Sequence, residues 1–197
     1  MSTSIIRHNW VEQALSSFRS HFASCGYTIP DNVRVSIGFT KGSTHGTLGQ
    51  CINKANSQDD HWELFISPIV GVSGDPEKDR LSTINILETI AHEMIHATVG
   101  LGCGHRGDFA VCAAAVGFTR PWRYTPAGDK MLAVIEQIVR QQGLFPSGGI
   151  KLPKKQGKSL VKCTCEGCGY VAYITAKNLE NVGTPICPDD REAMMCD

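Results

Sequence analysis

Residues 81–99, LSTINILETIAHEMIHATV, carry apolar side chains at every third or fourth position. This spacing predicts a helix that buries a broad face against the rest of the protein. The apolar positions are Leu81, Ile84, Leu87, Ile90, Ala91, Met94, Ile95 and Val99. Turn-forming residues at 73–79 precede this segment and Gly100 follows it, so we expect a helix whose last turns contain two histidines.

These two histidines, His92 and His96, are four residues apart. Residues at this spacing lie about 40° apart around a helix, so both rings can bind one zinc ion from the same face. Glu93 is adjacent to them but points in another direction, which suits a carboxylate that acts as general base without ligating the metal. The alternative is a pair of histidines satisfied in the core or by solvent, without a metal.

A catalytic zinc needs a third protein ligand, and few downstream residues qualify. Residues 94–135 contain no glutamate, which argues against a glutamate ligand on a following helix. Gly102 occupies the position where the metzincin pattern requires a histidine. We therefore favour His105, which lies in a glycine-rich turn. Cys103 and Asp108 are the alternatives, and we otherwise interpret them as a buried thiol and a turn-capping residue.

Weaker patterns predict the remaining elements of the first domain. Apolar residues at helical spacing predict helices at 5–25, 109–116 and 131–139. Alternating apolar and polar residues at 33–37 and 62–66 predict strands of a small antiparallel sheet. Helices combined with a small antiparallel sheet are typical of the α+β class.

The charge composition restricts the classes of function. Lys+Arg and Asp+Glu both total 19, so the chain lacks the strong positive charge of a dedicated nucleic-acid-binding protein. No run of about 18 apolar residues is available to span a membrane, and the amino terminus lacks the apolar run of a signal peptide. We expect a cytoplasmic protein without a membrane partner.

The nine cysteines fall into two groups. In a protein that is not exported, we expect thiols or metal ligands more often than disulfides. Four are scattered and are predicted to lie in the core, namely Cys25, Cys51, Cys103 and Cys112. The other five crowd residues 163–197, namely Cys163, Cys165, Cys168, Cys187 and Cys196. Within this group, Cys165 and Cys168 have the Cys-x-x-Cys-Gly form of a zinc knuckle, which predicts a second metal site.

A lysine-rich segment indicates a boundary, with a catalytic domain at 1–146, a linker at 147–162 and a module at 163–197. The lysines of this segment are Lys151, Lys154, Lys155, Lys158 and Lys162. Such lysines can neutralise DNA phosphates, and Tyr170 and Tyr173 of the module offer faces on which bases can stack. The alternative is a solvated tether beside tyrosines that pack within strands.

Two segments resemble the SprT-like metallopeptidase family, which includes the Spartan proteases that act on DNA–protein crosslinks. They are HEMIHA at 92–97 and GHRGDF at 104–109. The segment ELFISP at 63–68 is similar to the strand that precedes the catalytic helix of that family. The resemblance extends over residues 33–118 and into the cysteine-rich tail. It departs from the family at Arg106, because a glycine often follows the third histidine directly.

The resemblance implies a zincin-like domain, a zinc-ribbon-like module and the activity of a zinc-dependent endopeptidase. His92, His96 and His105 would hold the catalytic zinc, and Glu93 would move a proton from the attacking water to the leaving amine. A donor for the oxyanion is left open among Arg106, Arg120, Arg123 and Tyr124, which are otherwise surface or packing residues. The implied substrates are proteins, with DNA-associated or DNA-crosslinked proteins as candidates. Some family members are phage-encoded, which would place the protein in the host cytoplasm.

The resemblance also implies a structural zinc in the tail. Three of its ligands follow the knuckle pattern, namely Cys165, Cys168 and Cys187. The family usually has a fourth cysteine two residues after the third, where this chain has Asp189. We favour Cys196 as the fourth ligand, with Cys163 and Asp189 as alternatives. A reduced tail without a metal is the competing interpretation.

Two other functions remain to be distinguished from a DNA-linked endopeptidase. One is a non-catalytic, nucleic-acid-binding or transcription-associated protein that uses the first domain as a scaffold. The other is a peptidase without any role on DNA. Glu93 favours an enzyme, because a scaffold does not require a base beside its metal. Stimulation of cleavage by DNA would separate the two kinds of peptidase.

Overall fold

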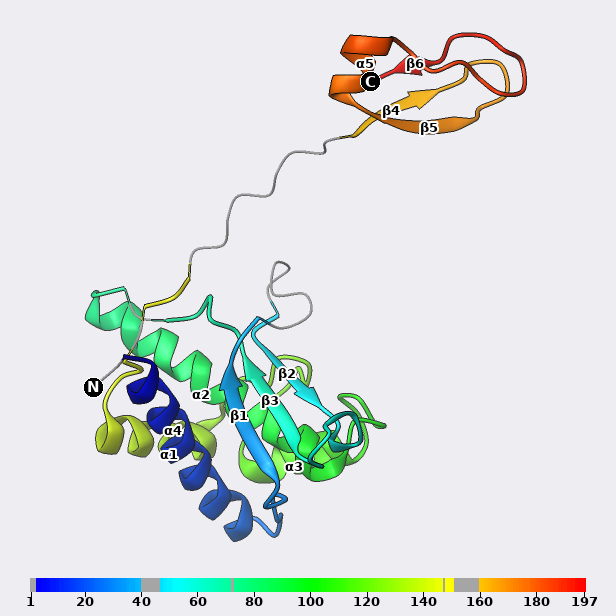
Figure 1. Ribbon diagram of the computed structural model, residues 1–197. Helices are drawn as coiled ribbons and strands as arrows, with labels where there is room; N and C mark the ends of the chain where they lie inside the picture. The colour runs from blue at the N-terminus through cyan, green and yellow to red at the C-terminus, as the bar shows by residue number, and fades with distance from the viewer. Residues whose placement is uncertain (1–2, 40–46, 72, 147, 151–159) are drawn as a thin grey trace. The chain divides into compact units, whose positions relative to one another are not determined.

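The chain forms two compact units, Met1–Leu152 and Pro153–Asp197, with α+β structure. The computed structural model describes residues 3–39, 47–71, 73–146, 148–150 and 160–197 (Figure 1). The division falls inside the predicted linker at 147–162. The start of that segment lies against the first unit, because the Ile150 N–H donates to the Pro68 carbonyl at 2.7 Å. Four of the predicted DNA-binding lysines, Lys151, Lys154, Lys155 and Lys158, lie outside the described residues.

The four helices predicted for the first unit are confirmed. They are α1 (Thr3–Ser24), α2 (Pro76–Val99), α3 (Asp108–Val116) and α4 (Asp129–Gln142). Only α2 begins well before its predicted start, because Asp75 caps it and Pro76 occupies its first turn. The Asp75 carboxylate accepts hydrogen bonds from the backbone N–H groups of Glu77 and Lys78. The apolar pattern therefore located the packed part of α2, and capping extends it.

The sheet of the first unit has three strands in the order β1-β3-β2. They are β1 (Val33–Ile37), β2 (Gly49–Ile52) and β3 (Trp62–Ile66), and a short 3₁₀ helix, η2 (Lys54–Asn56), follows β2. β1 and β3 are parallel, whereas β2 and β3 are antiparallel, so the sheet is mixed and the prediction of an antiparallel sheet was wrong in part. The reason is β2, which was not predicted. It takes the chain back before β3, so β3 runs in the direction of β1.

The core of this unit lies between the sheet and the helices. Alternate residues of β1 and β3 are buried, and these strands pack against α1 and α2 (Figure 1). Along α2, Leu87, Ile90, Met94 and Ile95 are fully buried, as the apolar pattern predicts. Each large side chain buried in this way contributes about 1.5–3 kcal/mol to folding. The resulting packing holds α2 against the sheet.

The second unit is a small antiparallel sheet with one short helix. Its elements are β4 (Leu160–Thr164), β5 (Val171–Thr175), α5 (Ala176–Val182) and β6 (Met195–Cys196), and the strand order is β5-β4-β6. Cys163 and Cys196 lie opposite each other in the β4–β6 pair and form a disulfide. The expectation of thiols or metal ligands is therefore wrong for this pair. Among the described residues of this unit, the buried cluster consists of Cys163, Cys165, Cys187 and Met194.

Candidate metal centres

The first candidate centre is formed by three histidines from α2 and the turn that follows it. The Nε2 atom of His105 lies 3.1 Å from Nε2 of His92 and 3.3 Å from Nε2 of His96. The rings from α2 converge because they are one turn apart on the same face. Gly100 ends α2 with φ of 86°, and Gly104 and Gly107 also have positive φ. These glycines turn the chain sharply enough to bring His105 back to the helix.

The spacing of the three nitrogen atoms fits a tetrahedral zinc ion. Two nitrogen ligands at 2.0–2.1 Å from zinc, separated by the tetrahedral angle, lie about 3.3 Å from each other. Burial, followed by the charges of the neighbouring histidines, lowers the pKa of His92 to about 3. Burial likewise lowers the pKa of His96 to about 4. Both imidazoles are thus neutral near pH 7, which is the form that ligates a metal.

Thr125 orients the ring of His92. The Nδ1 atom of His92 lies 2.8 Å from the hydroxyl oxygen of Thr125, so Nδ1–H can donate while Nε2 faces the centre. Thr125 is buried and has a φ of 41°, which is unusual for a β-branched residue. Hydrogen bonds to the remote nitrogen of a metal-binding histidine fix its tautomer and ring orientation. The sequence contains no motif that identifies Thr125.

Glu93 lies beside the histidines but is not part of the group that they form. Its side chain is only 6% exposed, and burial raises its pKa to about 8. A hydrogen bond from the Cys51 backbone acts in the opposite direction. A carboxyl poised near neutral pH is suited to accept and release a proton. Gly49, in β2, leaves the space for it, because a Cβ there would lie 2.5 Å from a Glu93 oxygen.

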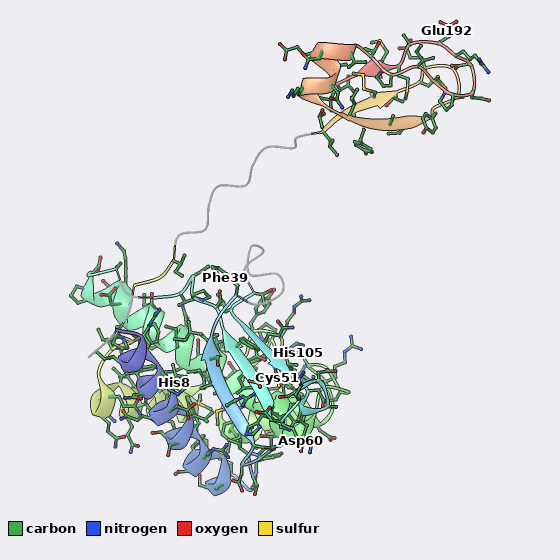
Figure 2. All side chains as sticks on the ribbon, viewed as in Figure 1. His8, Phe39, Cys51, Asp60, His105 and Glu192 are labelled. Carbon is green, nitrogen blue, oxygen red and sulfur yellow. A yellow bond between two sulfur atoms is a disulfide. The ribbon has the colours of Figure 1, made fainter. Side chains whose placement is uncertain are left out.

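A cleft of about 570 Å³ opens over these residues. One wall is β2, at the edge of the sheet, which contributes Gly49 and Cys51. Cys51 and His105, both labelled in Figure 2, line this cleft together. The segment 123–127, between α3 and α4, contributes Arg123, Tyr124 and Thr125 to the lining of the cleft. Within it, Thr125 meets His92, and the Ala127 N–H donates to Glu88 at 2.8 Å.

The residues left open by the sequence are now placed. Arg123 and Tyr124 line the cleft, whereas Arg106 and Arg120 line an adjoining pocket. The competing third ligands are elsewhere, since Cys103 directs its thiol to backbone carbonyls and Asp108 begins α3. Of the four cysteines predicted to be core residues, Cys51 and Cys112 are buried and Cys25 and Cys103 are half-buried.

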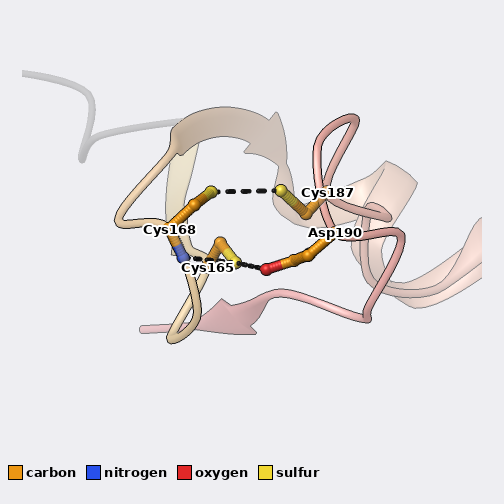
Figure 3. Close-up of side chains that lie close together, drawn as sticks. All are labelled: Cys165, Cys168, Cys187 and Asp190. Carbon is orange, nitrogen blue, oxygen red and sulfur yellow. Dashed lines mark hydrogen bonds between the residues drawn. The ribbon is translucent and has the colours of Figure 1, made fainter.

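The second candidate centre, in the carboxy-terminal unit, contains Cys165, Cys168, Cys187 and Asp190. Their ligand atoms all lie within 4.8 Å of one another. The Sγ atoms of Cys168 and Cys187 are 3.4 Å apart, and the Cys165 thiol donates to the Asp190 carboxylate at 2.8 Å (Figure 3). Three sulfur atoms and one carboxylate oxygen form a donor set that zinc accepts.

Asp190 is the residue that the sequence interpretation missed, and it corrects the choice among Cys196, Cys163 and Asp189. Cys163 and Cys196 are joined to each other, and Asp189 is not in the cluster. The reason is that the turn at 187–191 has the same hydrogen-bond pattern as the turn at 165–169. Gly169 N–H donates to the Cys165 carbonyl at 3.0 Å, and Arg191 N–H donates to the Cys187 carbonyl at 3.0 Å. Asp190 thus follows Cys187 at the spacing by which Cys168 follows Cys165.

A glycine again marks the close approach. A Cβ at Gly167 would lie 2.3 Å from Oδ2 of Asp190, so only glycine leaves the carboxylate in place. The other residues predicted to bind nucleic acid lie on the sheet of this unit or next to it. Lys162 is exposed on β4 opposite Tyr173 of β5, and Tyr170 is about half exposed just before β5.

Comparison with protein-family models, with curated proteins and with solved structures gives no match for this chain. No helix in the described ranges is both long and apolar enough to cross a membrane.

Proposed function

We propose that the first unit is a zinc-dependent endopeptidase of the SprT-like type, with a zincin-like catalytic domain. The observation that carries the proposal is the convergence of three histidine Nε2 atoms beside a buried glutamate in an open cleft. A purely structural zinc site is normally closed by four protein ligands, whereas a catalytic site keeps one position open. Three histidines with a carboxylate beside them correspond to the catalytic arrangement.

When bound, zinc would supply Lewis-acid polarisation of the scissile carbonyl and would acidify a water molecule. His92, His96 and His105 would hold it. Glu93 accepts a proton from the attacking water and delivers it to the leaving amine nitrogen as the C–N bond breaks. The Cys51 N–H and the space at Gly49 fix the Glu93 carboxylate for this transfer. Arg123 and Tyr124, which line the cleft, are the candidates for stabilising the oxyanion.

The Glu93→Gln variant tests this mechanism. We expect it to retain zinc, because Glu93 is not a ligand, and to lose cleavage of an unfolded protein such as casein by at least about a hundredfold. Glu77→Gln, an exposed change in the first turn of α2, is the matched control and should cleave normally. Cleavage by Glu93→Gln at the wild-type rate would refute the assigned role. Absence of cleavage by the zinc-loaded wild type, with or without DNA, would favour a scaffold.

We also propose that the second unit is a zinc-ribbon-like module with a structural zinc on Cys165, Cys168, Cys187 and Asp190. Its buried cluster of four residues is too small to stabilise a fold without further cross-links. Bound metal adds folding free energy that the small core cannot supply. Removal of zinc by a chelator should therefore unfold this unit, as measured by loss of amide dispersion in its NMR spectrum. A spectrum unchanged by chelation would contradict the proposal.

A role of this module on DNA is a second candidate function, favoured by one observation. Tyr173 is 64% exposed and lies opposite Lys162 across the β4–β5 pair. An exposed ring beside a cation can stack a base and neutralise a phosphate. Tyr173→Ala should weaken binding of a labelled single-stranded oligonucleotide about tenfold in fluorescence anisotropy. Ile186→Ala, an equally exposed change in the same unit, is the control. Equal binding by both variants would leave the peptidase without this DNA contact.

A further inference from the structure

A second pocket lies next to the cleft over the three histidines. Three arginines line this second pocket. Arg106 comes from the turn after α2, and Arg120 and Arg123 come from the segment before α4. The pocket encloses about 680 Å³, and Trp122 forms part of its wall. The Arg120 guanidinium lies over the Trp122 ring, 5.6 Å from its centroid. This contact holds one of the three cations against an apolar surface.

The three guanidinium groups have no acidic partner among the residues that the structure describes. The ion pairs found among the described residues involve other cations, and none joins Arg106, Arg120 or Arg123 to a carboxylate. The chain as a whole has a formal net charge of zero, so this concentration of positive charge is local. Like charges gathered around one cavity repel each other, and an anionic group placed between them removes that repulsion.

The pocket borders the cleft that contains the candidate catalytic centre, because the two share lining residues. His105 and Arg123 line both cavities. A polypeptide lying across the three histidines would therefore have a neighbouring side chain close to the arginines.

We propose that this pocket is a specificity subsite that binds an acidic side chain of the polypeptide substrate, next to the bond that is cleaved. The proposal rests on the peptidase function proposed above. Guanidinium groups match the planar geometry of a carboxylate and bind it through paired hydrogen bonds. A peptide carboxylate fits better than a nucleic-acid backbone, because the cations surround one pocket instead of following a track. The electroneutral chain also lacks a wider basic field.

Binding can be measured without turnover by using the full-length, zinc-loaded Glu93→Gln chain. The probes are fluorescent alanine–serine dodecapeptides that carry either Glu or Gln at one position, scanned along the peptide. We expect a Glu peptide to bind about tenfold more tightly than its Gln partner at one or two positions, with the difference decreasing as salt is added. Adding Arg106→Gln and Arg120→Gln together should abolish this preference. Arg140→Gln, an exposed change on α4, is the control and should preserve it.

The possible outcomes separate this inference from the peptidase proposal. Equal affinity for Glu and Gln peptides at every position would overturn the subsite, whatever the catalytic activity. A Glu preference that survives loss of Arg106 and Arg120 would also overturn it. An oligonucleotide that binds more tightly than any Glu peptide and depends on these arginines would reassign the pocket to nucleic acid. A Glu preference in a protein whose wild type cleaves no peptide would support the subsite while refuting the peptidase.

Discussion

Gly49 is important to the proposed site because it has no side chain. Its backbone lies directly beside the Glu93 side chain. Gly49 lies in β2, and a Cβ there would be 2.5 Å from both a Glu93 oxygen and a Thr89 methyl carbon. Both distances are far below van der Waals contact. The Glu93 side chain therefore keeps its position only because residue 49 is glycine.

Gly49→Ala should displace Glu93 while leaving the three histidines in place. Because a displacement of about 1 Å in a catalytic group can reduce the rate about a hundredfold, we expect kcat to fall by that order with zinc content unchanged. Gly102→Ala is the control, since a Cβ there would meet nothing within 4 Å. Steady-state cleavage of casein and zinc analysis of the same samples would test this. A normal kcat would show that the carboxylate position is not critical.

Thr125 acts on the site through His92. Thr125→Val keeps the shape of the side chain and removes the oxygen that lies 2.8 Å from Nδ1. Loss of such a partner typically lowers metal affinity about 10- to 100-fold, and we expect a decrease in that range. Competition with a chromophoric chelator, on the chain ending at Leu152, measures it. Thr119→Val, whose hydroxyl donates to the Pro126 carbonyl in the same region, should retain full affinity.

Single residues differ in how far the sequence predicts their roles. His92, Glu93, His96 and His105 were identified because their spacing reflects helical geometry and a glycine turn. Thr125 and Gly49 act through contacts between segments that are distant in the chain, and no local pattern records these contacts. Asp190 is intermediate, because the spacing of the first knuckle, applied to Cys187, would have located it.

At the scale of elements, α2 depends on a polar network at its amino-terminal end. The Asp79 carboxylate accepts hydrogen bonds from the Ser73 and Gly74 backbone N–H groups and from the Ser73 hydroxyl. Asp79 is buried, and these bonds hold its pKa below the ordinary value. They fasten the segment before α2 onto its first turn, which is where the apolar pattern gave no prediction.

Asp79→Asn should change the pH dependence of stability. A carboxyl whose pKa is lowered on folding adds stability above its unfolded pKa, near 3.9, and this stability is lost as pH falls through the folded pKa. We expect the variant to have a lower Tm at pH 7 and a shallower loss of Tm between pH 5 and pH 3. Thermal unfolding followed by circular dichroism measures both. Asp129→Asn at the start of α4 is the control, and parallel curves for wild type and Asp79→Asn would contradict the account.

The elements were predictable to the extent that they are amphipathic. The helices α1 to α4 and the strands β1 and β3 each bury one regular face, and the sequence records this as a period. The short strand β2 has one buried side chain, Cys51, so it has no such period. Because β2 also sets the direction in which β3 runs, the mixed sheet could not be predicted without it.

At the scale of the whole molecule, the two units have separate cores and separate candidate metal centres. The first unit buries large aliphatic and aromatic side chains, including Phe18, Phe22 and Phe109. The second buries mainly sulfur-containing residues. The first core should therefore remain folded without the second unit, whereas the second unit depends on its metal and its disulfide.

The most direct test of the account is the zinc-to-protein ratio, measured by elemental analysis of three purified forms. We predict a ratio near two for the full chain, near one for the chain ending at Leu152, and near one for the full chain with His92→Ala and His96→Ala. A ratio of one in both the full and the shortened wild-type chains would remove the second centre. No zinc in the chain ending at Leu152 would contradict the central claim, because three converging histidines would then have no metal with which to act.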